Sequence, residues 1–147
     1  MVQHSTVPVK IDGEHVDVDI DVADLVRELN AADFKTLQSC QEASPKLWEA
    51  GESYIEIEHL RAAERERLLK AIERTLQRMA SENYPAFSTC RVGIMDEVQG
   101  IIAVHPKYVD RTTQLVCSCF NRKGDLGAAR ARRREVLQEL AKTLREG

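Results

Sequence analysis

An Asp-Gly pair stands between two runs of alternating apolar and polar residues near the start of the chain, residues 7–11 and 15–20. A two-residue type I′ turn needs positive φ at both central positions, and Asp-Gly is among the pairs that accept this geometry. Residues 12–13 therefore predict a β-hairpin. A two-residue turn fixes the register, so that Val9 faces Val16 across the two strands.

Three later segments repeat apolar residues with the period of an α-helix. They predict helices over residues 21–30, 60–83 and 125–145, with Asp21 and Asp125 as N-caps because a carboxylate accepts hydrogen bonds from the first turn. The expected buried positions are Val22, Leu25, Val26 and Leu29 in the first helix, Leu68, Leu69, Ile72, Leu76 and Met79 in the second, and Val136, Leu137, Leu140, Ala141 and Leu144 in the third.

Extended segments are expected between the helices, and residues 84–100 are expected to be irregular. The resulting order is ββαββαββα, which contains the βαββαβ pattern of ferredoxin-like folds. The sequence thus predicts one α+β domain over residues 1–147, a two-layer fold with a ferredoxin-like antiparallel sheet and helices on one face. The expected strands after the hairpin are residues 34–40, 54–58, 101–105 and 114–120.

Several functional classes have no support in the sequence. No run approaches the roughly 20 apolar residues of a membrane span, and the first residues lack a secretory signal, so we expect a cytoplasmic protein without a membrane partner. Phosphate-binding loops, dinucleotide-binding glycine patterns, zinc-protease motifs and nucleophile elbows are absent from the sequence. No cofactor or resident metal is predicted.

The cysteines are expected to be free thiols, since disulfides are rare in a reducing compartment. A zinc site formed by these thiols with His59 or His105 is the alternative. The four cysteines are Cys40, Cys90, Cys117 and Cys119.

Charge is distributed unevenly along the chain. Residues 1–60 carry four Lys/Arg and thirteen Asp/Glu, whereas residues 61–147 carry 17 and 11. Such a split predicts that the two halves attract each other, within one chain or across a dimer. The alternative is a basic surface for an anionic partner such as a nucleic acid.

The junction at Cys40, Gln41 and Glu42 is the first candidate site, because a predicted strand there meets a long loop that carries Trp48. A cysteine nucleophile needs a nearby base or a helix N-terminus, and His59 would reach Cys40 if their two strands were neighbours. Three interpretations stay open. Cys40 could fill the core while Gln41 and Glu42 tie the loop down, the loop could bind a ligand, or Cys40 could act in catalysis.

The same region carries a resemblance. Residues 19–30 and 34–40, a helix ending in Leu-Asn followed by a strand ending in Ser-Cys, look like small uncharacterised bacterial and phage proteins. They are also faintly similar to the wybutosine-synthesising tRNA methyltransferase family, whose strand ends in Ser-Ser-Cys-Ser-Gly-Arg. Here the strand ends in Gln-Ser-Cys-Gln-Glu, without the glycine and arginine, and about 22 of 147 residues are covered. The family's activity is therefore not carried over.

Alternating carboxylates form a second candidate site at Asp17, Asp19 and Asp21. If they faced Glu56 and Glu58, their oxygens would suit a hard cation such as Mg²⁺ or Ca²⁺. The alternative is the polar face of a half-buried strand.

A basic segment opens the last predicted helix. Arg130, Arg133 and Arg134 share one helical face, so they could converge on a phosphate or an RNA backbone. The alternative is a solvated or subunit-bridging face. The whole basic set is Arg122, Lys123, Arg130, Arg132, Arg133 and Arg134.

These observations favour a small cytosolic module that binds a protein partner without catalysis and self-associates. One alternative is an anionic-ligand or nucleic-acid binder that uses the arginines and the loop at residues 41–53. The other is a thiol- or metal-dependent enzyme centred on Cys40.

Overall fold

A computed structural model of the chain describes residues 4–43, 51–80, 88–99 and 110–147. Its elements follow the predicted order ββαββαββα. They are β1 (Thr6–Ile11), β2 (Glu14–Asp19), α1 (Ile20–Ala31), β3 (Thr36–Ala43), β4 (Glu52–Glu58), α2 (Ala62–Ala80), β5 (Ser88–Gln99), β6 (Asp110–Asn121) and α3 (Leu126–Glu146).

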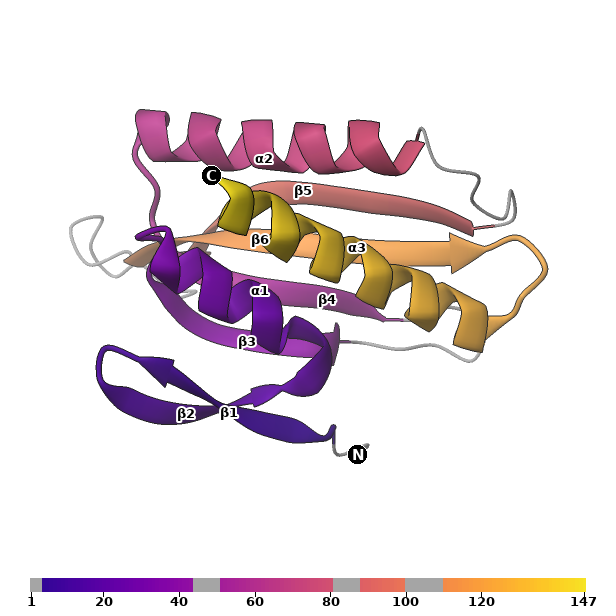
Figure 1. Ribbon diagram of the computed structural model, residues 1–147, viewed down its shortest axis with the longest axis horizontal. Coiled ribbons are helices and arrows are strands. Elements are labelled where there is room, and N and C mark those ends of the chain that lie inside the picture. Colours follow the sequence, from indigo (N-terminus) through magenta and orange to yellow (C-terminus); the bar gives the residue numbers. More distant parts are fainter. Residues whose placement is uncertain (1–3, 44–50, 81–87, 100–109) are drawn as a thin grey trace.

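Four strands form an antiparallel sheet in the order β3-β4-β6-β5, and β1 pairs with β2 in a separate two-stranded sheet. Figure 1 shows α1 and α3 crossing one face of the larger sheet, with α2 running along the β5 side. Ile72 of α2, Val92 of β5 and Val136 of α3 surround one small gap between side chains, so α2 lies on the same face. The predicted two-layer α+β class is confirmed. β2, the first strand of the inner βαββαβ pattern, pairs with β1 instead of joining the larger sheet.

The predicted hairpin is confirmed in both turn and register. Asp12 and Gly13 have φ values of 51° and 83°, as a type I′ turn requires. Val9 lies opposite Val16, and Val7 lies opposite Val18. Val9 and Val18 are buried against the core, so the hairpin is anchored beside α1 and the edge of the larger sheet.

The first and third helices bury the positions that their spacing predicts, except that Leu144 of α3 is only partly buried. Asp125 caps α3 by accepting a hydrogen bond from the backbone N–H of Ala128 at 3.0 Å. The prediction that Asp21 caps α1 is wrong, because the helix begins at Ile20 and Asp21 lies within its first turn.

The apolar stripe of α2 is narrower than its spacing predicts. Leu68, Ile72 and Met79 are buried as expected, but Leu69 and Leu76 are exposed. The reason is that, among the described elements, α2 packs mainly against α3 and β5 at the margin of the helix layer, so that only one narrow side of the helix is covered.

The prediction that residues 84–100 are irregular is wrong, since β5 occupies Ser88–Gln99 and pairs with β6 along its whole length. Cys90, Val92 and Ile94 alternate along β5 and pack against the core. The strand predicted at residues 101–105 lies outside the described residues.

The prediction of four free thiols is also wrong, because Cys90 and Cys119 form a disulfide. The two residues are direct partners in the β5–β6 register, which places their Cα atoms 4.1 Å apart. Cys40 and Cys117 remain free thiols.

No helix in the described segments is long and apolar enough to cross a membrane.

Candidate functional site

Gln41, in β3, joins three elements at one end of the molecule. Its backbone N–H donates to Oδ2 of Asp19 at 2.9 Å, and its side-chain Oε1 accepts from the backbone N–H of Asp21 at 3.1 Å. Its backbone oxygen accepts from the hydroxyl of Ser53 in β4. Gln41 therefore fastens the hairpin and the start of α1 to the edge of the larger sheet.

Glu42, the next residue, meets two arginines of α3. Its carboxylate accepts two hydrogen bonds from Arg130, both at 2.8 Å, and one from Arg133 at 3.0 Å. The hydrogen bonds of Arg130, helped by the one from Arg133 and by the charges of both arginines, lower the pKa of Glu42 from 4.5 to about 2. Arg133 is only 1% exposed and also donates to the backbone oxygen of Gly51. The predicted role of Gln41 and Glu42 in tying down the loop at residues 41–53 stays a prediction, because residues 44–50 lie outside the described residues.

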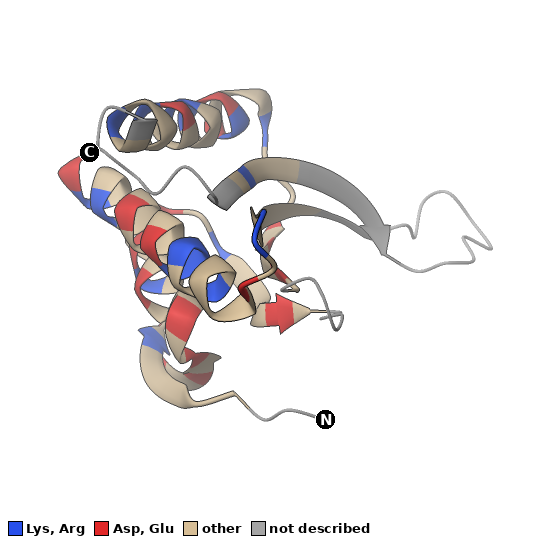
Figure 2. Cartoon of the chain, turned by 90° about the vertical axis from the view of Figure 1, so that its right-hand side faces the viewer, with Lys and Arg blue, Asp and Glu red and all other residues tan. Residues whose placement is uncertain are grey.

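Two further arginines of α3 pair with acids of the N-terminal half. Arg134 lies 2.9 Å from a carboxylate oxygen of Asp21, and Arg145 lies 3.0 Å from one of Glu28. Figure 2 shows basic segments of α3 beside acidic segments of the earlier elements. The acidic first half and the basic second half of the chain therefore attract each other within one molecule. The predicted dimer stays a prediction, and the uneven charge no longer argues for it.

The predicted anion-binding residues are brought together only in part. Arg130 and Arg133 converge on Glu42, whereas Arg134 turns to Asp21. These contacts neutralise the arginine face with carboxylates of the same chain. Trp48, the remaining predicted loop residue, lies outside the described residues.

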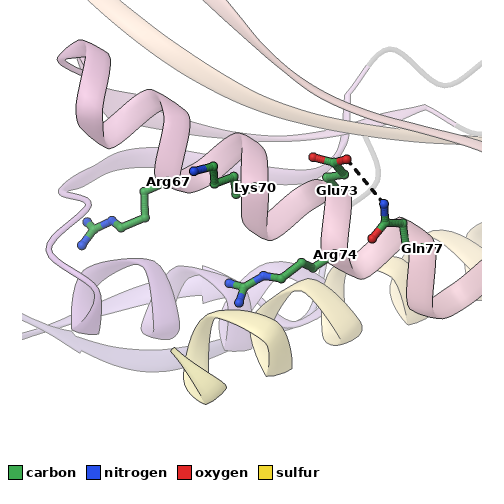
Figure 3. A pocket seen from close by; sticks show the side chains of 5 residues that line it. All are labelled: Arg67, Lys70, Glu73, Arg74 and Gln77. Atoms are coloured by element: carbon green, nitrogen blue, oxygen red, sulfur yellow. Dashed lines mark hydrogen bonds between the residues drawn. The ribbon is translucent and has the colours of Figure 1, made fainter.

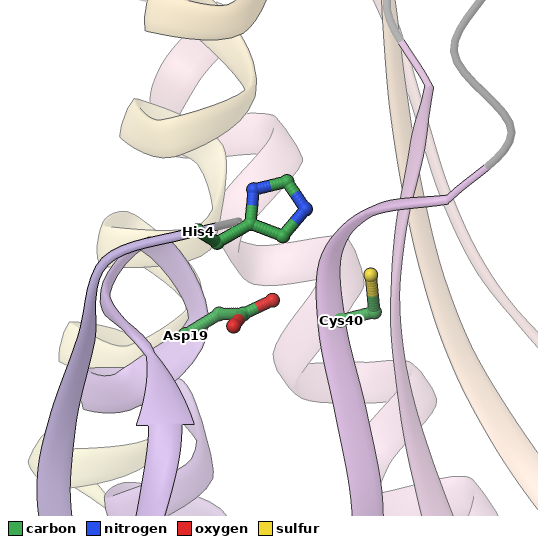
Figure 4. A group of neighbouring side chains, drawn as sticks. All are labelled: His4, Asp19 and Cys40. Carbon is green, nitrogen blue, oxygen red and sulfur yellow. The ribbon is translucent and has the colours of Figure 1, made fainter. Parts of the chain in front are cut away.

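Cys40 lies beside a histidine and a carboxylate that the sequence did not associate with it. One potential metal-binding atom from each of His4, Asp19 and Cys40 lies within 4.8 Å of the others, and all three side chains are half-buried (Figure 4). Tyr54 lies directly across from Cys40 on β4. Burial, together with the nearby acidic groups, raises the pKa of Tyr54.

The expected partnership of Cys40 with His59 is wrong. Their strands are neighbours, but the antiparallel register sets Cys40 opposite Tyr54 and Thr36 opposite Ile57. His59 therefore follows the far end of β4. His4 takes its place because the hairpin register sets Thr6 opposite Asp19.

The predicted acidic ladder does not form one cation site. Asp17 and Asp19 lie on β2, which pairs with β1, whereas Asp21 belongs to α1. Glu56 and Glu58 lie on β4, which is separated from the hairpin by β3. The strand that carries Asp17 and Asp19 pairs with β1 as predicted, but it does not lie next to β4, so the ladder does not face Glu56 and Glu58.

A groove of about 270 Å³ runs between β2 and β3. Among the described strands, β2 pairs only with β1 and β3 only with β4, so each presents an open edge to this groove. Val16 and Leu37, on opposite sides, are 43% and 51% exposed. The complete lining is Ile11, Val16, Asp17, Val18, Val26, Thr36, Leu37, Gln38 and Ser39.

A second hollow, of about 360 Å³, lies on one side of α2 (Figure 3). Arg67, Lys70 and Arg74 contribute its positive charges, and Glu73 and Gln77 complete it. All five side chains come from one helix, so this hollow is a surface depression without a second wall of described residues.

Comparison with known proteins reveals no relative, since no family model, no curated protein and no solved structure matches the chain. The resemblance of residues 19–40 to the wybutosine-synthesising family therefore stays a prediction.

Proposed function

We propose that this protein binds an extended segment of a partner protein in the groove between β2 and β3. The observation that carries this proposal is the pair of open strand edges, one from each sheet, that border the groove. Edge strands present backbone N–H and C=O groups that lack partners. An extended peptide can satisfy such groups by adding a strand to the sheet.

The residues that line the groove indicate which side chains the partner segment carries. Val18 and Val26 are buried, while Val16 and Leu37 leave apolar surface exposed. An aliphatic side chain of the partner would cover this surface, at about 25 cal/mol for each Å² of apolar area removed from water. Asp17 is exposed at the same groove, so its negative charge favours a Lys or Arg next to the aliphatic residue of the partner segment.

The walls of the groove favour a peptide over a metabolite. Pockets that enclose small molecules usually measure about 300–1,000 Å³ and bury most of the ligand. This groove, at about 270 Å³, lies near the lower end of that range, but two strand edges form its sides and offer backbone groups along an extended chain. One or two side chains of an extended segment suit these dimensions.

A separate partner is favoured over a second copy of the chain. The α3 arginines, which would attract the acidic half of a second copy, already meet Glu42, Asp21 and Glu28.

Selection from a random peptide library tests the proposal. We expect the wild type to enrich peptides that alternate aliphatic and basic residues, and the Leu37→Glu variant to bind them at least tenfold more weakly. Leu69→Glu is the matched control, because Leu69 is also an exposed leucine, at 43%, but lies on α2. Failure to enrich any peptide, or equal weakening by the two variants, would overturn the proposal.

A further inference from the structure

We propose that His4, Asp19 and Cys40 form a binding site for a divalent transition-metal ion of the zinc type. They come from three separate segments, since His4 precedes β1, Asp19 ends β2 and Cys40 lies within β3. The fold brings one donor atom of each to within 4.8 Å of the others. This proposal does not depend on peptide binding in the groove.

The donor set selects the class of metal. Imidazole nitrogen, carboxylate oxygen and thiolate sulfur are the three ligand types that zinc takes in proteins. Mg²⁺ and Ca²⁺ prefer oxygen ligands alone, so the thiol and the imidazole disfavour them. Tetrahedral zinc holds its ligand atoms about 3.5 Å apart, so binding an ion would draw together donor atoms that now lie within 4.8 Å of one another.

Gln41 orients two of the three ligands. Its backbone N–H holds Oδ2 of Asp19, which leaves Oδ1 for the ion. Its side-chain amide is hydrogen-bonded to Nδ1 of His4 at 3.1 Å, which leaves Nε2. Hydrogen bonds from neighbouring residues to metal ligands set the orientation of a histidine ring and the basicity of the ligands.

Coordination through Nε2 places the ring proton of His4 on Nδ1, so Gln41 must turn its amide oxygen toward the ring. A carboxylate at this position would accept from His4 and also from the backbone N–H of Asp21, which now donates to Gln41. We therefore expect Gln41→Glu to strengthen metal binding.

Three protein ligands leave a fourth position for water or another ligand, as in zinc sites that are not purely structural. Asp19 and Cys40 directly follow the groove-lining residues Val18 and Ser39 on their strands. A bound ion would therefore join β2 to β3 at one end of the groove.

Titration of the metal-free full-length chain with Co²⁺, followed by displacement with Zn²⁺, tests the site. Co²⁺ is the probe because a cobalt–thiolate bond gives a near-ultraviolet charge-transfer band. We expect one Co²⁺ per chain with this band, and Zn²⁺ should displace it. His4→Ala and Asp19→Asn should weaken binding at least tenfold, and Cys40→Ser should abolish the band.

Two matched variants control for general effects. His15 is an exposed histidine of the same hairpin, and Cys117 is the other free thiol, so His15→Ala and Cys117→Ala should keep the band and the affinity. Gln41→Glu should raise the affinity several-fold. Absence of 1:1 binding, a band that survives Cys40→Ser, or a band lost in Cys117→Ala while circular dichroism is unchanged would overturn the proposal.

Discussion

Replacing Glu42 by glutamine removes the carboxylate that neutralises Arg133, which is 1% exposed. The fall of the Glu42 pKa from 4.5 to about 2 corresponds to about 3 kcal/mol of stability, at ~1.36 kcal/mol per unit. Breaking a buried ion pair by removing one partner typically costs about 3–5 kcal/mol, in agreement with this figure. We therefore expect Glu42→Gln to lower the free energy of unfolding at pH 7 by about 3 kcal/mol.

Urea unfolding followed by circular dichroism measures this change between pH 7 and pH 2. The pKa of Glu42 is lower in the folded state, so its stabilising effect is complete above pH 4.5 and is lost as the pH falls toward about 2. The difference between wild type and variant should therefore shrink over that range. Glu135→Gln is the control, because Glu135 pairs with Arg132 on the surface and its side chain is 52% exposed; it should change stability by less than about 1 kcal/mol.

A double variant separates the buried charge from other effects of the substitution. In Glu42→Gln with Arg133→Met no charge is left unpaired at the Arg133 position, so most of the lost stability should return. The reasoning would be refuted if Glu42→Gln stayed within 1 kcal/mol of the wild type at pH 7 and kept the same pH dependence.

Three further predictions follow from local geometry. Gly51→Ala should destabilise the fold by about 1–3 kcal/mol, because a Cβ there would clash with the backbone oxygen of Ala43, whereas Gly93→Ala meets open space; equal urea midpoints would contradict this. Asp125→Ala removes the α3 cap and should cost about 1 kcal/mol by the same assay, so an unchanged midpoint would count against the cap. Burial raises the pKa of Cys117 to about 12, so iodoacetamide at pH 8 should leave it unmodified in native protein and modify it in urea; mass spectrometry of the peptides decides, and equal modification would contradict the burial.

Local sequence patterns predicted the elements whose causes are themselves local. The Asp12-Gly13 turn needs only its own backbone geometry and the alternation around it, and both the turn and the register of Val9 with Val16 were predicted correctly. The buried faces of α1 and α3 follow from their spacing in the same way. In contrast, α2 lies at the margin of the layer and buries less than its stripe offers.

Pairing partners far apart in sequence could not be predicted. β5 carries an alternation at Cys90, Val92 and Ile94, but its strand character depends on β6, some twenty residues later. The cross-strand disulfide to Cys119 was missed for the same reason.

The candidate site shows this limit most clearly. The arginines of α3 were found from their helical spacing, but the sequence does not show that Glu42 lies opposite Arg130 and Arg133. His4 and Cys40 meet only because the hairpin folds against β3, a contact that no local pattern encodes.

The central claim is that the groove between β2 and β3 receives an extended segment of a partner. Titration of ¹⁵N-labelled protein with an enriched peptide, followed through the backbone amide signals, tests it most directly. We predict that the largest shifts fall at residues 16–18 and 37–39, with slower hydrogen exchange at the edge amides of β2 and β3. Shifts confined to residues 67–77 of α2, or amide exchange that the peptide leaves unchanged, would contradict the claim.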